Sequence, residues 1–112
     1  MLQSQNRLRR SDEILAVIKG GRVSKQDSFL VRFRKNNLQL ARFGFVVSAR
    51  EVKRATRRNL LKRRAREIVR KKMQNIKKGH DILFVFNKKA AALKSSELEA
   101  VMIYSLSAAG LL

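Results

Sequence analysis

The spacing of hydrophobic residues near the start of the chain is helical. Ile14, Val17 and Ile18 recur at intervals of three and four after Ser11, which is a favourable N-cap residue, and two glycines follow at positions 20 and 21. Glycine pairs commonly end helices. We therefore expect a first helix over residues 11–19.

The next apolar positions follow a strand-like period of two. Between residues 28 and 34, Phe29, Val31 and Phe33 should face the core while Leu30, Arg32 and Arg34 face the other way. Lys35-Asn36-Asn37 then predicts a hairpin turn, and residues 38–48, rich in Phe and Val, predict one or two further strands. The continuous apolar run at 81–86 is typical of a central strand.

Two further helices are expected. A long basic one should cover residues 55–77, and a last one should begin at Ser96, whose spacing to Glu99 is that of a capping box, and end at Gly110. The resulting order, α-β-β-β-α-β-α, predicts an α+β sandwich with a mostly antiparallel four-stranded sheet, helices largely on one face and a split βαβ crossover. Without proline, repeats or a linker-like segment, residues 1–112 are expected to form a single domain.

The charge of the chain points to a polyanionic partner. Its 112 residues carry 27 Lys and Arg against 8 Asp and Glu, a formal net charge of +19. Solubility alone requires a net charge of only about 2 to 8 in a small domain. The absence of cysteine suits a reducing, cytoplasmic location, and no run approaches the ~18 apolar residues of a membrane span or resembles a signal peptide. We expect a nucleic-acid-binding protein with no membrane partner.

The long helix should have one apolar face, packed on the core, and one cationic face. On a helical projection Leu61, Ala65, Ile68 and Val69 form one apolar stripe. The adjoining arc is polar and cationic; its members are Asn59, Lys62, Arg63, Arg66 and Arg70. Like charges at this spacing repel by a few tenths of a kcal/mol per pair, and phosphates lying along the arc would offset that repulsion. A solvated charged face is the alternative, but the density of charge disfavours it.

The segment Phe43-Gly-Phe-Val-Val-Ser-Ala-Arg-Glu-Val-Lys-Arg-Ala-Thr-Arg-Arg-Asn-Leu-Leu-Lys-Arg-Arg-Ala-Arg-Glu67 resembles the signature of the bacterial ribonuclease P protein component. In that family a strand ending in Val-Ser is followed by a short basic loop and an Arg-Asn-Arg-x-x-Lys-Arg-like helix start. Asn6-Arg7-Leu8 ahead of the first helix and the terminal helix also match the family layout, so the resemblance extends over nearly the whole chain.

The resemblance implies RNA-binding roles for particular residues. Those expected to contact the catalytic RNA are Arg50, Lys53, Arg54, Arg57, Arg58, Asn59, Lys62, Arg63, Arg66 and Arg70. Leu60 stands where the family usually has a second Arg, so one phosphate contact should be missing. Asn59 has an alternative interpretation as a helix-start residue that bonds its own backbone.

The resemblance also implies a cleft between the first helix and the sheet for the single-stranded 5′ leader of precursor tRNA. Its expected lining is Asn6, Arg7, Ile14, Ile18, Leu30 and Arg32. Ile14 and Ile18 replace the family's aromatic residues, and Arg32 stands where an aromatic is common, so leader binding should depend more on charge and less on stacking. Ordinary core packing is the alternative for Ile14 and Ile18.

No catalytic or metal-binding constellation is visible in the sequence. The eight acids are scattered apart from Asp12-Glu13, and the single histidine, His80, lies in an expected turn. The resemblance implies that the RNA subunit carries the chemistry with Mg2+, and that this chain is a monomer in a 1:1 complex with that RNA. A ribosomal protein and a non-specific DNA-compacting protein are the alternative functions.

Overall fold

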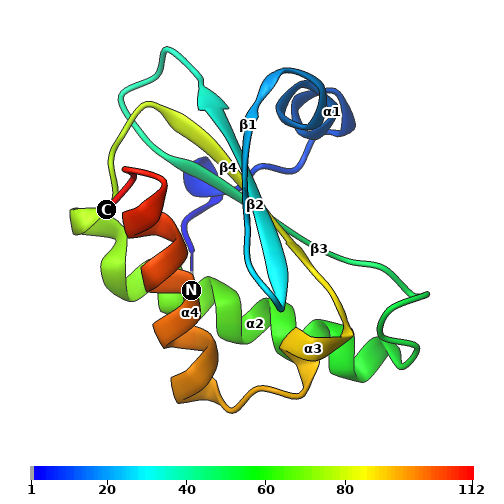
Figure 1. The fold of residues 1–112 in the computed structure, drawn as a ribbon. Helices are drawn as coiled ribbons and strands as arrows, with labels where there is room; N and C mark the ends of the chain where they lie inside the picture. The colour runs from blue at the N-terminus through cyan, green and yellow to red at the C-terminus, as the bar shows by residue number, and fades with distance from the viewer. Residues whose placement is uncertain (1) are drawn as a thin grey trace.

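The computed structural model describes residues 2–112 (Figure 1). The elements in chain order are the 3-10 turn η1 (Ser4–Asn6), α1 (Ser11–Gly20), β1 (Arg22–Lys25), β2 (Phe29–Lys35), β3 (Arg42–Val47), α2 (Ala55–Lys72), the 3-10 turn η2 (Met73–Asn75), β4 (His80–Phe86), α3 (Lys88–Ala91) and α4 (Ser95–Ala108). The α+β class is confirmed. The short helix α3 was not expected from the sequence.

The four strands form one sheet in the order β1-β2-β4-β3. β2 pairs antiparallel with both β1 and β4, and β3 pairs parallel with β4, so the sheet is mostly antiparallel as predicted. The predicted split βαβ crossover is not observed. β3 and β4 are direct neighbours, so the connection through α2 is not split by an intervening strand.

The predicted hairpin turn at residues 35–37 was wrong, because β4 lies between β2 and β3. Asn36 N–H instead donates to Gly79 O, and Gly79 N–H donates to Leu40 O, so the loop after β2 is joined to the loop before β4. The hairpin of this sheet joins β1 to β2. The short, largely exposed strand β1 was missed because its four residues have no apolar alternation.

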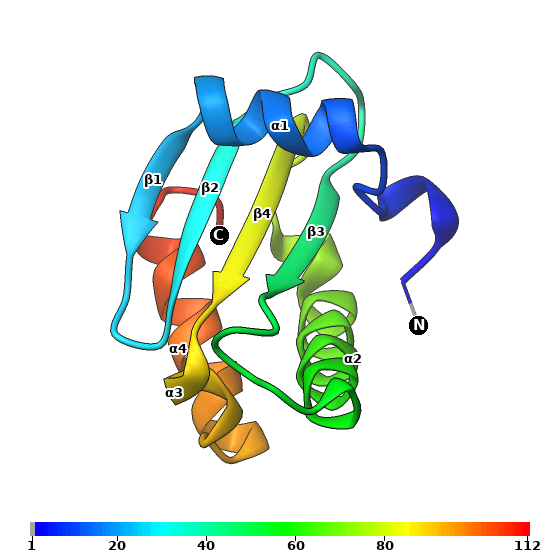
Figure 2. The ribbon, with the colours of Figure 1, turned by 90° about the vertical axis from the view of Figure 1, so that its right-hand side faces the viewer.

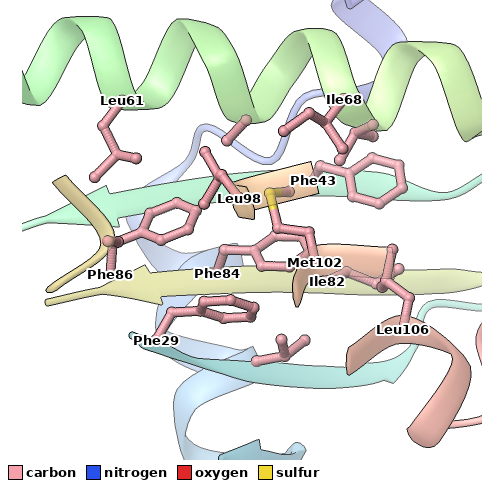
Figure 3. Close-up of a cluster of buried hydrophobic side chains, with 14 of the residues drawn as sticks. Phe29, Phe43, Leu61, Ile68, Ile82, Phe84, Phe86, Leu98, Met102 and Leu106 are labelled. Atoms are coloured by element: carbon pink, nitrogen blue, oxygen red, sulfur yellow. The ribbon is translucent and has the colours of Figure 1, made fainter. Parts of the chain in front are cut away.

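The main core lies between the sheet and the pair α2 and α4 (Figure 3). Phe84 of the central strand β4 is fully buried, and its ring lies 5.7 Å from the rings of both Phe29 and Phe45 and 6.0 Å from that of Phe86. As predicted, Phe29 and Val31 are buried in this core. The period of two along β2 therefore determines which side of the sheet carries α2 and α4.

Helix α1 covers the opposite face of the sheet and is the exception to the expectation, otherwise met by α2 and α4, that the helices lie largely on one face. Figure 2 shows α1 crossing one end of the strands while the rest of this face stays uncovered. A small separate cluster of Leu8, Val17 and Leu83 packs beneath the helix. The protein thus has three layers, one of them incomplete.

An ionic network attaches α1 to the sheet. Arg42 of β3 donates from Nε and Nη2 to the two carboxylate oxygens of Asp81, at 2.8 Å each, and from Nη1 to Glu13 Oε2 of α1 at 2.6 Å. The Asp81 side chain is 7% exposed, and Asn36 Nδ2 donates to it at 2.9 Å. The hydrogen bond to Asp81 is the main reason that the pKa of Arg42 is raised above its usual value. This network fixes the position of α1.

Two predicted helix boundaries were wrong. α2 ends at Lys72 rather than near residue 77, because η2 tightens the chain and turns Ile76 into the core. α4 begins at Ser95, one residue early, and its capping acid is Glu97, which accepts from the Lys94 backbone N–H at 2.8 Å.

Candidate RNA interface

Helix α2 buries the apolar stripe that its sequence predicts. Leu61, Ala65, Ile68 and Val69 are all buried against the main core, and Figure 3 shows Leu61 and Ile68 pointing from the helix toward the sheet. Because the stripe is held in this way, the helix cannot rotate about its axis. The remaining arc of α2 is therefore directed away from the core.

The cations of that outer arc are mostly without acidic partners. Among residues 2–112, no carboxylate lies within ion-pair distance of Lys62, Arg63 or Arg66. Arg70 does have one: its Nη2 lies 2.5 Å from Glu67 Oε1, and this bond lowers the pKa of Glu67. Both side chains of that pair are about half exposed, so the pair contributes little to stability and a phosphate could replace the carboxylate. We name Asn59, Lys62, Arg63, Arg66 and Arg70 the cationic row.

The basic loop before α2 is fixed to the helix by Arg58. Its Nη1 donates to the carbonyl oxygens of Val52 and Lys53, at 2.8 Å each. This contact gives a structural reason for a cation in the first turn, where the helix dipole disfavours one. Arg58 is thereby only partly exposed, whereas Asn59 beside it is exposed and its amide has no hydrogen-bond partner within residues 2–112, which does not support the backbone-bonding alternative for Asn59.

The other predicted RNA contacts gather around the start of α2. Arg50, Lys53, Arg54 and Arg57 are all exposed. Three of them, Lys53, Arg54 and Arg57, line a hollow of about 420 Å³ together with Lys88 of α3. Sequence reasoning missed Lys88, because α3 reaches this loop only in the folded chain: Lys88 N–H donates to the Glu51 carboxylate at 3.1 Å, and Ala90 packs in the same core as Val52.

The sheet face that α1 leaves uncovered carries a second candidate surface. Leu30 and Arg32 lie on this face, as the alternation predicts. A shallow groove of about 250 Å³ lies there, and its lining includes Lys25, Leu30, Val46, Val85, Phe86 and Asn87. Arg32 Nη1 donates to Ile18 O at 3.1 Å, which places Arg32 at the end of α1, where Ile18 is 40% exposed. We name this surface, from Ile18 to the groove, the open sheet face.

The six residues predicted for the leader cleft do not all lie on the open sheet face. Ile14 is half-buried against the small cluster under α1, and Val46 and Val85 of the open sheet face pack against the same cluster. Asn6 Nδ2 donates to Ala41 O at 2.8 Å, and Arg7 forms an isolated bridge to Phe43. These two residues therefore lie beside the edge strand β3, apart from Leu30 and Arg32 on β2.

Comparison with known proteins decides the family. The chain matches the family model described as Ribonuclease P over residues 2–110. It is also 40% identical over 102 residues to the ribonuclease P protein component of Thermotoga maritima, which covers 91% of this chain and 83% of that protein. This chain belongs to the ribonuclease P protein family. The ribosomal and DNA-compacting alternatives are thereby rejected.

Other members of the ribonuclease P protein family agree with this assignment. The protein component of Dehalococcoides mccartyi strain CBDB1 is 35% identical over 111 residues, 99% of this chain and 90% of that protein. The solved structure of the Thermotoga maritima protein in complex with 1-(4-fluorophenyl)-2-thiourea has a TM-score of 0.81 at 35% identity, covering 88% of this chain and 94% of that one. A Staphylococcus aureus RNase P protein structure, at 21% identity and a TM-score of 0.90, supports the fold.

As a ribonuclease P protein, the chain is a subunit of a tRNA-processing ribonucleoprotein. Within residues 2–112, no group of three or more His, Cys, Asp or Glu side chains could hold a metal ion. His80 is buried, and its Nδ1 lies 3.2 Å from Lys78 O. No helix in the described part of the chain is both long and apolar enough to cross a membrane.

Two residues of the open sheet face, Val46 and Val85, were missed by sequence reasoning. In the register of the sheet Val46 pairs with Val85, and Val85 pairs with Leu30, so all three lie on the same face. The alternation within each strand could have assigned their side. Val46, Val85 and Leu30 are neighbours only because β4 lies between β2 and β3, and the predicted hairpin gave a different strand order.

Proposed function

We propose that this chain binds the catalytic RNA of ribonuclease P through α2 and the 5′ leader of precursor tRNA through the open sheet face, and so assists endonucleolytic removal of the leader. The observation that carries the proposal is the cationic row: its helix is locked by a buried stripe, and Lys62, Arg63 and Arg66 have no carboxylate partner among residues 2–112. Neutralising phosphates with such side chains releases counterions and supplies most of the affinity for RNA.

The proposal assigns the chemistry to RNA and Mg2+ in the cytoplasm. The described residues offer no carboxylate cluster suited to Mg2+, so the ion is assigned to the RNA and no step is routed through this chain. The chain acts by reducing repulsion between the leader and the catalytic RNA, as a monomer in a 1:1 complex. This would raise substrate affinity and lower the Mg2+ concentration that cleavage requires.

The open sheet face suits a single strand better than a duplex. Leu30, Val46 and Val85 form an apolar floor, and Lys25 and Arg32 lie beside it. Bases can lie on such a floor while the phosphates meet the cations, although the described floor has fewer aromatic surfaces than a typical stacking platform. We infer weak, sequence-tolerant leader binding.

Reconstitution tests the proposed function. Adding the purified chain to a bacterial ribonuclease P RNA at low Mg2+ should raise the rate of precursor-tRNA cleavage above that of the RNA alone, measured by the release of labelled leader. The matched control is the same RNA with an equally basic peptide that does not fold. Equal stimulation by the peptide, or none by the chain, would reject the proposal.

The leader assignment is tested at the end of α1. Ile18→Ala should weaken binding of leader-bearing precursor about fivefold, since about 1 kcal/mol of apolar contact is lost, and should leave binding of mature tRNA unchanged. Ile14→Ala, one turn earlier, should likewise weaken binding of the precursor more than binding of mature tRNA. A lower melting temperature with the preference for precursor kept would instead assign Ile14 to the core. An equal loss for both tRNAs would contradict the assignment.

A further inference from the structure

A separate hollow of about 530 Å³ lies where the N-terminal segment, the loop before β3 and the C-terminal end of α2 meet. Its volume falls in the range of about 300 to 1,000 Å³ typical of small-ligand sites. It is distinct from the open sheet face, because it lies beyond the β3 edge, where Asn6 donates to Ala41 O. Two residues with predicted RNA contacts line it: Arg70, assigned to the catalytic RNA, and Asn6, assigned to the leader cleft.

The hollow has an apolar floor. Leu2, Ala41 and Ile76 are buried side chains of the main core that also line the hollow, and Met73 packs against the same core. The flat face of a ligand could therefore contact this floor without burying a polar side chain of the protein.

The rim of the hollow is rich in side-chain amides. It is formed by Gln3, Gln5, Asn6, Gln39 and Gln74. Some of these amides are already engaged: Gln5 Nε2 donates to Gln3 Oε1 at 3.2 Å, and Asn6 bonds Ala41. Among residues 2–112, the amides of Gln39 and Gln74 have no hydrogen-bond partner. Each of them offers a donor and an acceptor to a ligand.

Two cations line the same hollow, Arg70 and Lys78. Arg70 is the last member of the cationic row, so a strand whose phosphates follow α2 would reach the hollow at that point. Lys78 follows η2 and is exposed. A base placed between them would have a positive side chain for the phosphate at each end of its nucleotide.

We infer that this hollow binds one unstacked nucleobase of the RNA strand that lies along α2, with adenine as the best match. The inference rests on the proposed function. Glutamine amides form paired hydrogen bonds with the N6 and N7 edge of adenine, and single-stranded bases are recognised by edge hydrogen bonds and by stacking on Arg or apolar groups. Gln39 and Gln74 supply the edge contacts, and Arg70 supplies the guanidinium.

Nucleotide titration tests this inference without any catalytic RNA. Adenosine 5′-monophosphate should shift the side-chain amide NMR signals of Gln39 and Gln74 in the full chain. Ribose 5-phosphate, which has the same sugar and phosphate but no base, should leave those signals in place. Gln74→Leu and, separately, Gln39→Leu should each reduce the response to the nucleotide.

The same variants should also reduce RNA binding in a diagnostic way. Gln74→Leu should weaken binding of a single-stranded oligoadenylate about tenfold relative to an abasic strand of equal length, and should leave the salt dependence unchanged because no phosphate contact is lost. Equal shifts with ribose 5-phosphate, or nucleotide shifts confined to the open sheet face, would overturn the inference. Failure of reconstitution with intact adenosine-specific shifts would instead reject the proposed function alone.

Discussion

Replacing Arg42 with methionine should lower the free energy of unfolding by about 3 kcal/mol, because it leaves the buried Asp81 carboxylate without its cation. Loss of one partner of a buried ion pair costs about 3 to 5 kcal/mol, and the 20% exposure of the Arg42 side chain places this case at the lower end. For a domain of this size the melting temperature should fall by about 12 to 24 °C, which calorimetry would measure.

Two further variants isolate the cause of that loss. Glu13→Gln removes the outer carboxylate of the network, which is more exposed than Asp81, and should cost about 1 kcal/mol or less. The double variant Arg42→Met, Asp81→Leu removes both buried charges and should recover much of the stability lost by Arg42→Met alone. No recovery would mean that Arg42 stabilises the fold through packing rather than through its charge.

Changing Arg63 and Arg66 together to glutamine should weaken binding to ribonuclease P RNA by at least about 150-fold. Each charged hydrogen bond contributes about 1.5 to 3 kcal/mol, and both cations lack a carboxylate partner within residues 2–112. The logarithmic salt dependence of binding should also become shallower by about 1.5 to 2 units, since two fewer counterions are released. Filter binding over a series of salt concentrations would measure both effects.

Lys19→Gln is the matched control for the cationic row. Lys19 is an exposed cation on α1, across the sheet from α2. Its replacement should leave the salt dependence of RNA binding nearly unchanged. If the arginine variants also keep the wild-type salt dependence, their side chains face solvent in the complex and the cationic row does not contact RNA.

The spacing of apolar residues predicted helices and strands correctly where one face of the element is buried. The stripe of Leu61 and Ile68 was correctly assigned to the core, because helical geometry relates neighbours three and four residues apart whatever else surrounds them. The strand β2 was found for the same reason at a period of two. β1 was missed because an exposed edge strand has no buried face to create a pattern.

The candidate site was only partly accessible from sequence. The cationic row follows from one helix, whereas the hollow with Gln39 and Gln74 combines three segments that are distant in the chain. Neither glutamine carries a signal of its own. The leader cleft was predicted as one group, yet Asn6 lies beside β3 and Leu30 lies on β2.

The sequence by itself determined the two-sided character of α2, the surplus of positive charge and the family to which they belong, because period and composition are local properties of the chain. Only the tertiary structure decided that β4 lies between β2 and β3, that α1 covers one end of the opposite sheet face, and that Arg42 joins Glu13 to Asp81. These features depend on pairings between distant segments. The contacts that stabilise these features form only when distant segments of the chain meet. Local sequence patterns therefore do not predict them.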